Sequence, residues 1–237
     1  PFADGSVQEL PPNGQGIATL IALGILEQWD IGSYTPDSVP WLHLSIEAMK
    51  LALVDLDRYV TDYDHLEFPA ELLLSDSYLK QRAQLINPDQ AGDFTFGSPQ
   101  QSGTVYLSTA DASGMMVSFI QSNYMGFGSG VVVPGTGISL QNRGCGFSLD
   151  PQHPNVVAGS KRPFHTIIPA FALDAAGQPL MSFGVMGGPM QAQGHLQLAL
   201  RIMQHKQNPQ AAIDAPRWRV EQGRAVVVEP GIDRNVL

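Results

Sequence analysis

The chain has 237 residues, 43% of them hydrophobic, and a formal net charge of −9 at pH 7. A chain of this length can bury one sizeable core. Its acidic balance argues against nucleic acid and against an anionic membrane surface as partners, because both bind basic patches. Small-molecule or peptide substrates remain.

The first hundred residues are predicted to be mainly helical. Apolar residues recur at helical spacing over 17–26 and again over 42–54, which predicts two helices packed on a core. Ser75 and Asp76 are placed to cap a third helix at 77–85.

Residues 87–103 are rich in Pro, Gly, Gln and Ser, which predicts an exposed loop that can be cleaved. Thr104 follows this loop and opens a β-rich segment. If the chain is cut before Thr104, the new α-amine, with an ordinary pKa of about 8, can take the proton of the threonine hydroxyl. On its own, a threonine in this place is more often the first residue of an ordinary strand.

The part after Thr104 is predicted to be rich in strands. A loop at 126–130 is expected to be a turn, because no helix N-terminus or lysine follows it as phosphate binding requires. Helices ahead of a loop, then strands that end at a glycine pair before another helix, are typical of a mixed α and β fold. Strands are expected at 105–110, 115–122, 131–133, 167–173 and 180–185, and a helix at about 190–205.

An ordered set of short motifs carries the chemistry. The run PPNGQG at 11–16 and the acidic and aromatic stretch at 55–62 precede Thr104, and the run GVMGG at 184–188 follows it. With the glycine loop and the segments at 137–142 and 161–163, this set resembles the γ-glutamyltransferase family of N-terminal nucleophile hydrolases. The resemblance covers essentially the whole chain, which matches the middle and late part of a family precursor.

The resemblance implies an α+β fold, part of the αββα sandwich of N-terminal nucleophile hydrolases. Residues 1–103 would be the C-terminal part of the large-subunit region. Residues 104–237 would be the small-subunit region, truncated at its C-terminus, and the two would form one globular domain. Autocleavage of the bond between Gly103 and Thr104 would leave two associated halves, with a homodimer as a further possibility.

The resemblance also assigns catalytic roles. Thr104 would attack the amide, and Ser122 on the second strand would hydrogen-bond the nucleophile. Gly187 and Gly188 would hold the oxyanion with backbone N–H groups, assisted by the dipole of the helix that follows. Each assignment has a plain alternative: Ser122 as an ordinary strand serine, and the glycine pair as a tight turn.

The substrate positions depart from those of family members that bind a γ-glutamyl group. Arg143 and Gly146 stand where such proteins place an amide and an acid for the α-amino group. His165 and Thr166 stand where such proteins place paired serines for the α-carboxylate. Two residues after the supporting hydroxyl, where the family has an asparagine, this chain has Tyr124, with Asn123 directly before it. The substrate-binding residues are therefore expected to be Asn123, Tyr124, Arg143, His165 and Thr166.

Arg143 would favour an acyl group with a carboxylate and no amine, such as glutaryl, because a guanidinium matches a carboxylate. This makes an enzyme that resembles cephalosporin acylases the alternative to a γ-glutamyl enzyme. A surface ion pair explains Arg143 equally well, and a core-edge position is the commoner role for a residue such as His165. Without the family's upstream arginine, the chain could instead be an inactive structural piece or binding module.

Cys145 and two histidines remain. Cys145, the single cysteine, excludes an internal disulfide, leaves the compartment open between cytoplasm and periplasm, and is expected to be a small buried residue. His195 and His205 lie too far apart on one helix to form a metal pair, so no metal is expected. The sequence has no dinucleotide fingerprint, so no cofactor is expected.

Overall fold

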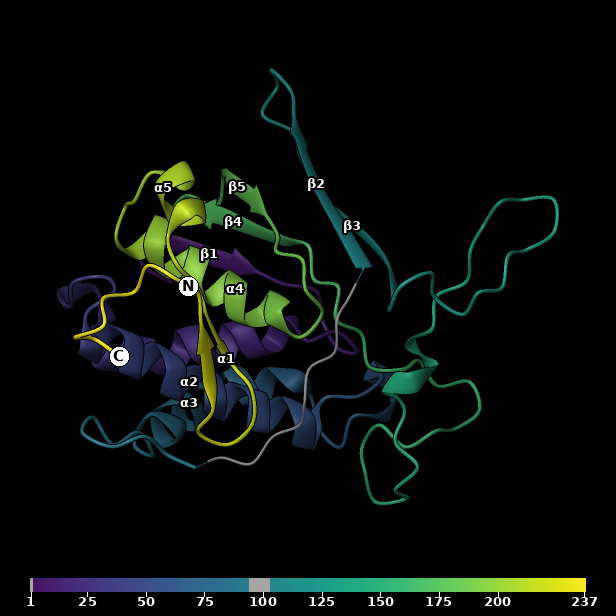
Figure 1. Cartoon of the computed structure of the whole chain (residues 1–237), viewed down its shortest axis with the longest axis horizontal. Helices are drawn as coiled ribbons and strands as arrows, with labels where there is room; N and C mark the ends of the chain where they lie inside the picture. The colour runs from purple at the N-terminus through teal and green to yellow at the C-terminus, as the bar shows by residue number, and fades with distance from the viewer. Residues whose placement is uncertain (1, 94–102) are drawn as a thin grey trace.

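The structure is a computed structural model that describes residues 2–93 and 103–237. It combines helices and strands in one mixed body with a projecting hairpin and an arm of loops (Figure 1), which confirms the α+β class. Most of the predicted cleavable loop, 94–102, lies outside the described residues. The helices are α1 (Gly16–Leu26), α2 (Val39–Tyr59), α3 (Asp76–Ala83), α4 (Met190–Ala199) and α5 (Pro209–Asp214), and the strands are β1 (Gly5–Gln8), β2 (Gly103–Ala110), β3 (Met116–Tyr124), β4 (Ala170–Asp174), β5 (Pro179–Phe183), β6 (Trp218–Val220) and β7 (Val226–Val228).

Helix α1 is the centre of the core. Ten of its eleven residues are buried, as expected for a helix that is apolar on every side. It packs against α2, α3 and α4. Among the described residues, no helix combines the length and apolar character that crossing a membrane requires.

The ends of the helices follow ordinary rules with one exception. Pro40 lies in the first turn of α2, where its missing N–H costs no helical hydrogen bond. Ser75 precedes α3 as predicted, but its hydroxyl donates to the carbonyl of Leu72 at 2.8 Å and does not cap the helix. The predicted helix at 190–205 begins at Met190 as expected, and its last turn, Leu200–Gln204, is π-helical.

Strands β1, β4 and β5 form an antiparallel sheet with β4 in the centre, and this sheet lies over α1 in Figure 1. The register pairs Val7 with Ala172 and Ala170 with Phe183. These four side chains are buried, because residues that alternate along a strand share one face and this face packs on the core.

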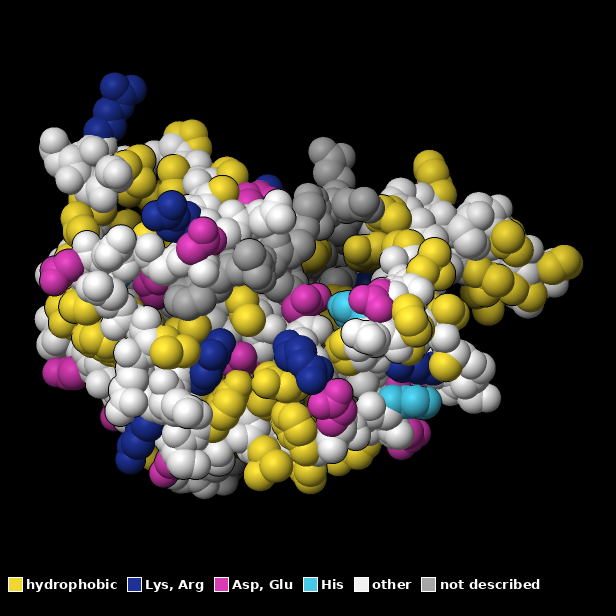
Figure 2. All heavy atoms as spheres, turned by 90° about the horizontal axis from the view of Figure 1, so that it is seen from below, with side chains coloured by type: hydrophobic (Ala, Val, Ile, Leu, Met, Phe, Trp, Pro, Cys, Tyr) yellow, Lys and Arg dark blue, Asp and Glu magenta, His cyan; other side chains and the backbone are white. Residues whose placement is uncertain are grey.

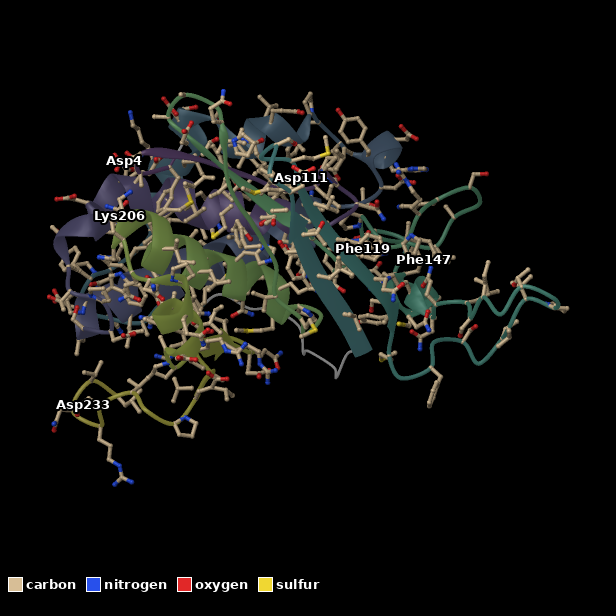
Figure 3. The ribbon with its side chains drawn as sticks, turned by 90° about the horizontal axis from the view of Figure 1, so that it is seen from above. Asp4, Asp111, Phe119, Phe147, Lys206 and Asp233 are labelled. Atoms are coloured by element: carbon tan, nitrogen blue, oxygen red, sulfur yellow. The ribbon has the colours of Figure 1, made fainter. Side chains whose placement is uncertain are left out.

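Strands β2 and β3 form a hairpin that projects from the body (Figure 1). Asp111 closes its turn, since its carboxylate accepts hydrogen bonds from the backbone N–H of Ser113 at 2.8 Å and of Met115 at 3.2 Å. Figure 3 labels Asp111 at the tip and Phe119 on the hairpin. The outer face carries apolar side chains that are 44–55% exposed: Val105, Leu107, Val117 and Phe119.

The inner face of the hairpin rests on β5 and the residues after it. The hydroxyl of Ser108 hydrogen-bonds that of Ser182. Further along, Tyr106 lies against Gly184 so closely that a Cβ at Gly184 would overlap the tyrosine ring. The absence of a side chain at Gly184 therefore allows the hairpin to reach its position.

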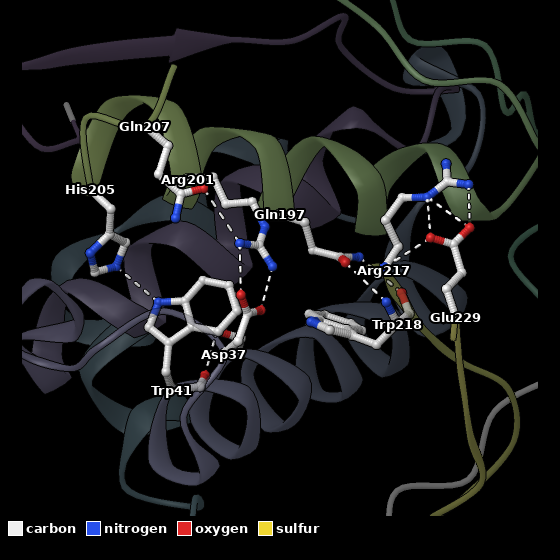
Figure 4. A network of polar contacts seen from close by, with 10 residues as sticks. Asp37, Trp41, Gln197, Arg201, His205, Gln207, Arg217, Trp218 and Glu229 are labelled. Carbon is white, nitrogen blue, oxygen red and sulfur yellow. Dashed lines mark hydrogen bonds and ion pairs between the residues drawn. The ribbon is translucent and has the colours of Figure 1, made fainter. Parts of the chain in front are cut away.

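Strand β6 is fixed to α4 by glutamine side chains. Gln193 exchanges two hydrogen bonds with the backbone of Val220, at 3.2 and 2.7 Å. Gln197 does the same with Trp218, at 2.9 and 3.0 Å (Figure 4). The pairing fits because residues four apart on a helix and two apart on a strand both advance by about 6 Å. The helix thus takes the place of a neighbouring strand.

Other polar contacts in this region join the end of the α4 segment to the start of α2. Arg201 pairs with Asp37, its Nη1 lying 3.0 Å from the carboxylate, and stacks over the ring of Trp41 (Figure 4). The indole N–H of Trp41 donates to Nε2 of His205 at 2.9 Å. Nearby on the surface, Lys206 forms an ion pair with Asp4 at 2.9 Å, and both are labelled in Figure 3.

Residues 125–165 form the arm of loops beside the hairpin (Figure 1). The strand predicted at 131–133 is absent, and a single bridge between Val132 and Ser139 takes its place. The glycine-rich stretch at 126–130 is a turn, as predicted. Apolar side chains gather on the arm (Figure 2), with Phe127 and Leu149 almost fully exposed.

Cys145 corrects one prediction, because it is exposed. It lies in a short 3-10 turn, Arg143–Gly146, within the arm. Among the described residues, no further layer of structure covers the outer side of this turn, so the small apolar side chain of Cys145 stays exposed.

Candidate active site

Thr104 and Ser122 lie opposite each other at the base of the hairpin. The Thr104 hydroxyl donates a hydrogen bond to Oγ of Ser122 at 3.1 Å. Oγ of Ser122 also accepts a hydrogen bond from the backbone N–H of Tyr124 at 2.9 Å. The structure therefore brings the predicted nucleophile and its predicted supporting hydroxyl into contact.

Tyr124 links this pair to the substrate positions. Its backbone has φ of 74°, a left-handed conformation that is costly for a residue with a side chain. The bond from its N–H to Ser122 holds this conformation. It directs the phenol ring beneath the guanidinium of Arg143, whose Cζ lies 4.9 Å from the ring centroid.

Arg143 is buried, with only 1% of its surface exposed, so the surface ion-pair interpretation is wrong. Its Nη1 donates to Oγ1 of Thr166 at 2.8 Å. Its Nε and Nη2 are buried without a hydrogen-bond partner among the described residues, and it forms no ion pair with them. Burial is the main reason that the pKa of Arg143 is lowered. Two donors of a desolvated cation thus have no hydrogen-bond acceptor among the described residues.

His165 lies next to this cation and is uncharged at neutral pH. Burial, and secondly the positive charge of Arg143, lower the pKa of His165 to about 4. Arg143 is therefore the charged member of this cluster, which also contains Thr166 and Tyr124.

Gln15 is a further member of the site. In the sequence analysis it was included only as part of the run PPNGQG ahead of the first helix and was assigned no role. It is 1% exposed, and its side-chain amide donates to the carbonyl of Thr166 at 2.7 Å and to that of Gly188 at 2.8 Å. Its backbone N–H donates to the carbonyl of His165 at 3.1 Å. The only signal in the sequence is a polar residue between two glycines directly ahead of an apolar helix.

Gly187 and Gly188 form the turn between β5 and α4. Both have positive φ, 124° and 60°, which favours glycine at each position. Their carbonyls accept the first N–H groups of the helix, those of Met190 and Gln191. Neither glycine N–H donates a backbone hydrogen bond to another described residue, so both stay available for an oxyanion.

The inner face of the hairpin packs along β5 and the residue after it. The hydroxyl of Ser108 hydrogen-bonds that of Ser182, and Tyr106 contacts Gly184. Thr104, the predicted nucleophile, lies two residues before Tyr106 on the same strand.

Asn123 stands apart from the other predicted residues. Neighbouring strand residues point to opposite faces, and Asn123 borders a cavity of about 460 Å³ with Val105, Ser122 and Ile138 among its other lining residues. Its carbonyl accepts a hydrogen bond from the backbone N–H of Asn142 at 3.2 Å. It lies next to Ser122 in the sequence, and no hydrogen bond among the described residues joins it to Arg143.

The two histidines of the α4 segment have structural partners. Nδ1 of His195 lies 2.6 Å from a carboxylate oxygen of Glu9, and both side chains are fully buried. His205 accepts the indole hydrogen bond of Trp41. Within the described part of the chain, no three His, Cys, Asp or Glu side chains are grouped so that they could hold a metal ion.

Comparison with known proteins decides the family. Residues 1–237 match the gamma-glutamyltranspeptidase family over the full chain. The chain belongs to this family. The resemblance inferred from the motifs is thereby confirmed.

Relatives within the family carry several activities in their names. The chain is 40% identical to the glutathione hydrolase-like YwrD proenzyme of Bacillus subtilis and 40% identical to the oxamate amidohydrolase proenzyme of Klebsiella pneumoniae, in each case over 90% of this chain. It is 32% identical to the acylase ACY 1 proenzyme of a Pseudomonas species over 90% of this chain. It spans about 40% of the length of each of these relatives.

A solved structure gives the same relationship. The crystal structure of cephalosporin acylase from Bacillus halodurans is 50% identical and superimposes with a TM-score of 0.92. The similarity covers all of this chain and 42% of that one.

Proposed function

We propose that this family member is an amidohydrolase proenzyme whose nucleophile is Thr104. The observation that carries the proposal is the hydrogen bond from Thr104 to Ser122 at the start of β2. Relatives named as proenzymes support a precursor that is processed. Cleavage before Thr104 would free its α-amine, and the two halves would remain associated within an αββα sandwich.

The chemistry follows from the arrangement of the donors. The Thr104 hydroxyl oxygen attacks the amide carbonyl while the α-amine takes its proton, and Ser122 orients the hydroxyl. The N–H groups of Gly187 and Gly188 hold the negative oxygen of the tetrahedral intermediate. The C–N bond breaks as the leaving amine receives the proton. Water then adds to the acyl-threonine ester and releases the acid, or an amine accepts the acyl group instead.

Arg143 supports an acyl group that carries a carboxylate. Two of its nitrogens are buried without a partner among residues 2–93 and 103–237, and a carboxylate that bridged them would gain charge-assisted hydrogen bonds. The described residues around Arg143 offer no matching site for an ammonium, because Arg143 is cationic without an ion-pair partner among them and His165 is neutral. We therefore place a dicarboxylic monoamide, such as a glutaryl amide, ahead of a γ-glutamyl amide.

The names of three relatives agree with this preference. Oxamate, named for the relative from Klebsiella pneumoniae, is a small monoamide with a carboxylate and no amine. Acylases are named for two further relatives. Glutathione hydrolase-like proteins are related too, so the γ-glutamyl group remains the competing substrate.

Two measurements on the full-length precursor test the proposal. Mass spectrometry and N-terminal sequencing should find two fragments, the smaller beginning at Thr104, and Thr104→Ala should stay as one chain. A single chain in the parent protein would instead support an inactive structural or binding module. Catalytic efficiencies on glutaryl and γ-glutamyl anilides should favour glutaryl, and Arg143→Gln should narrow or reverse the gap. Equal efficiencies, unchanged by Arg143→Gln, would return the substrate to the γ-glutamyl class.

A further inference from the structure

Gln15 joins two parts of the candidate site directly through one side chain. On one side is Thr166, whose hydroxyl accepts the hydrogen bond from Arg143 at 2.8 Å. On the other side is Gly188 of the oxyanion turn. The single side-chain amide of Gln15 donates one hydrogen to each backbone carbonyl, at 2.7 and 2.8 Å. A second link runs through Gln191, whose side chain accepts from the N–H of Ile168 at 3.3 Å.

The backbone around Gln15 makes this bridge rigid. The N–H of Gln15 donates to the carbonyl of His165 at 3.1 Å, and the N–H of His165 donates to the carbonyl of Asn13 at 3.0 Å. The side chain of Asn13 donates to the carbonyl of Pro163 at 2.6 Å. Residues 13–15 thus hold the segment that carries His165 and Thr166 through three hydrogen bonds. The side chain of Gln15 extends from this fixed position to Gly188.

Gly188 needs such a support. Without a side chain, its backbone has wide freedom about φ and ψ, and its N–H is one of the two proposed oxyanion donors. The carbonyl of Gly188 is held by Gln15 and by the first turn of α4 through the N–H of Gln191 at 3.0 Å. Holding this carbonyl fixes the peptide plane that follows Gly188. The preceding plane, which carries the Gly188 N–H, is held at its other end by the carbonyl of Gly187, which accepts from the N–H of Met190 at 3.2 Å.

We infer that Gln15 is a positioning residue that sets the distance between the carboxylate-binding Arg143 and the oxyanion donors. This inference rests on the proposed function. It predicts the length of the acyl group, because the group must reach from Arg143, which binds its carboxylate, to the glycine turn, which binds its reacting carbonyl. A substrate whose carboxylate sits on Arg143 then has its reacting carbonyl at the turn only if Gln15 holds both parts in register. Misplacement of such groups by about 1 Å can reduce rates by about a hundredfold.

Gln15→Met is the direct test, because methionine keeps the length of the side chain and removes both donors. On a glutaryl anilide we expect kcat to fall by at least about tenfold and KM to rise, since both ends of the substrate lose their alignment. On the Arg143→Gln background, Gln15→Met should still lower kcat but should no longer raise KM. This split would not follow from a general loss of stability.

Gln197→Met is the matched control. Gln197 is also buried, and its side chain hydrogen-bonds the backbone of Gln193 and Trp218, which lie outside the candidate site. It should lose stability like Gln15→Met and keep parental kcat and KM when assayed below its melting temperature.

A second variant adds a pH readout. In Gln15→Glu, the side chain can donate only when it is protonated, so its activity relative to the parent enzyme should rise as the pH falls. Parental kcat and KM in folded Gln15→Met would overturn the inference, and so would equal kinetic losses in Gln197→Met. If the parent protein neither cleaves at Thr104 nor hydrolyses amides, the proposed function fails instead, and the two failures are distinguishable.

Discussion

Removing the Ser122 hydroxyl should separate catalysis from stability. Oγ of Ser122 accepts hydrogen bonds from Thr104 at 3.1 Å and from the N–H of Tyr124 at 2.9 Å. Each such bond contributes about 1 kcal/mol net, and an N–H left unpaired costs about 1–3 kcal/mol. Ser122→Ala should therefore lower the free energy of unfolding by about 2 kcal/mol, and the strained backbone of Tyr124 should relax.

The kinetic effect should be at least as large. Loss of about 1.4 kcal/mol of alignment at the nucleophile is a tenfold loss in rate, so autocleavage and acylation should slow about tenfold or more. The assay is the appearance of the small fragment on gels from freshly purified precursor, followed by single-turnover acylation of the mature enzyme. Ser122→Thr keeps the hydroxyl and should retain most of both rates.

Ser118→Ala is the control on the same strand and the same face. Ser118 hydrogen-bonds the hydroxyl of Tyr106 at 3.0 Å and the carbonyl of Phe183 at 3.4 Å. It should cost similar stability and leave both rates within about twofold of the parent, because about 0.4 kcal/mol corresponds to a factor of two. If Ser118→Ala and Ser122→Ala slow the enzyme equally, the hydroxyl of Ser122 has no special role and the reasoning is refuted.

Three further outcomes are expected. Gly188→Val should twist the oxyanion turn, which has φ of 60° there, and lower turnover by about a hundredfold; normal turnover in a folded variant would exclude this N–H as a donor. In an NMR titration His165 should keep a neutral ring down to a pKa of about 4, and Arg143→Gln should raise that pKa without restoring the ordinary value, because burial is the larger cause. Burial raises the pKa of the Glu9 carboxyl above 4.5, although the attraction of His195 opposes the shift. The folded protein therefore holds this proton more tightly than the unfolded chain does, and the resulting stabilisation is lost as the pH rises through the raised pKa. Glu9→Gln should therefore reduce the fall in melting temperature toward neutral pH, and an unchanged fall would show that another group causes it.

Local sequence patterns were sufficient to predict the elements whose conformation depends mainly on neighbouring residues in the chain. The apolar helices α1 and α2 and the hairpin around Asp111 follow from periodicity and turn chemistry. Strand β6 did not, because it is only three residues long and its partners on one edge are the side chains of Gln193 and Gln197 on a helix. The strand predicted at 131–133 failed because β-branched residues in the arm have no neighbouring strand to pair with.

The candidate site divides in the same way. The contact between Thr104 and Ser122 follows from their places on two strands of one hairpin. The burial of Arg143 depends on Tyr124 and Thr166, which approach it from different segments. The contact of Gln15 with Gly188 joins residues 173 positions apart, and no local pattern in a single sequence reports such a contact.

The glutamine pairing between α4 and β6 has a consequence for how this protein can vary. One inserted residue between Gln193 and Gln197 would turn the second amide by about 100° away from the strand, so the helix cannot change length there without releasing β6. The connection between β6 and β7 has no such constraint, since both strands can stay in place while it grows. Lengthening the loop at 221–225 is therefore the change that this region should tolerate, whereas a single-residue insertion between Gln193 and Gln197 should detach β6 from α4.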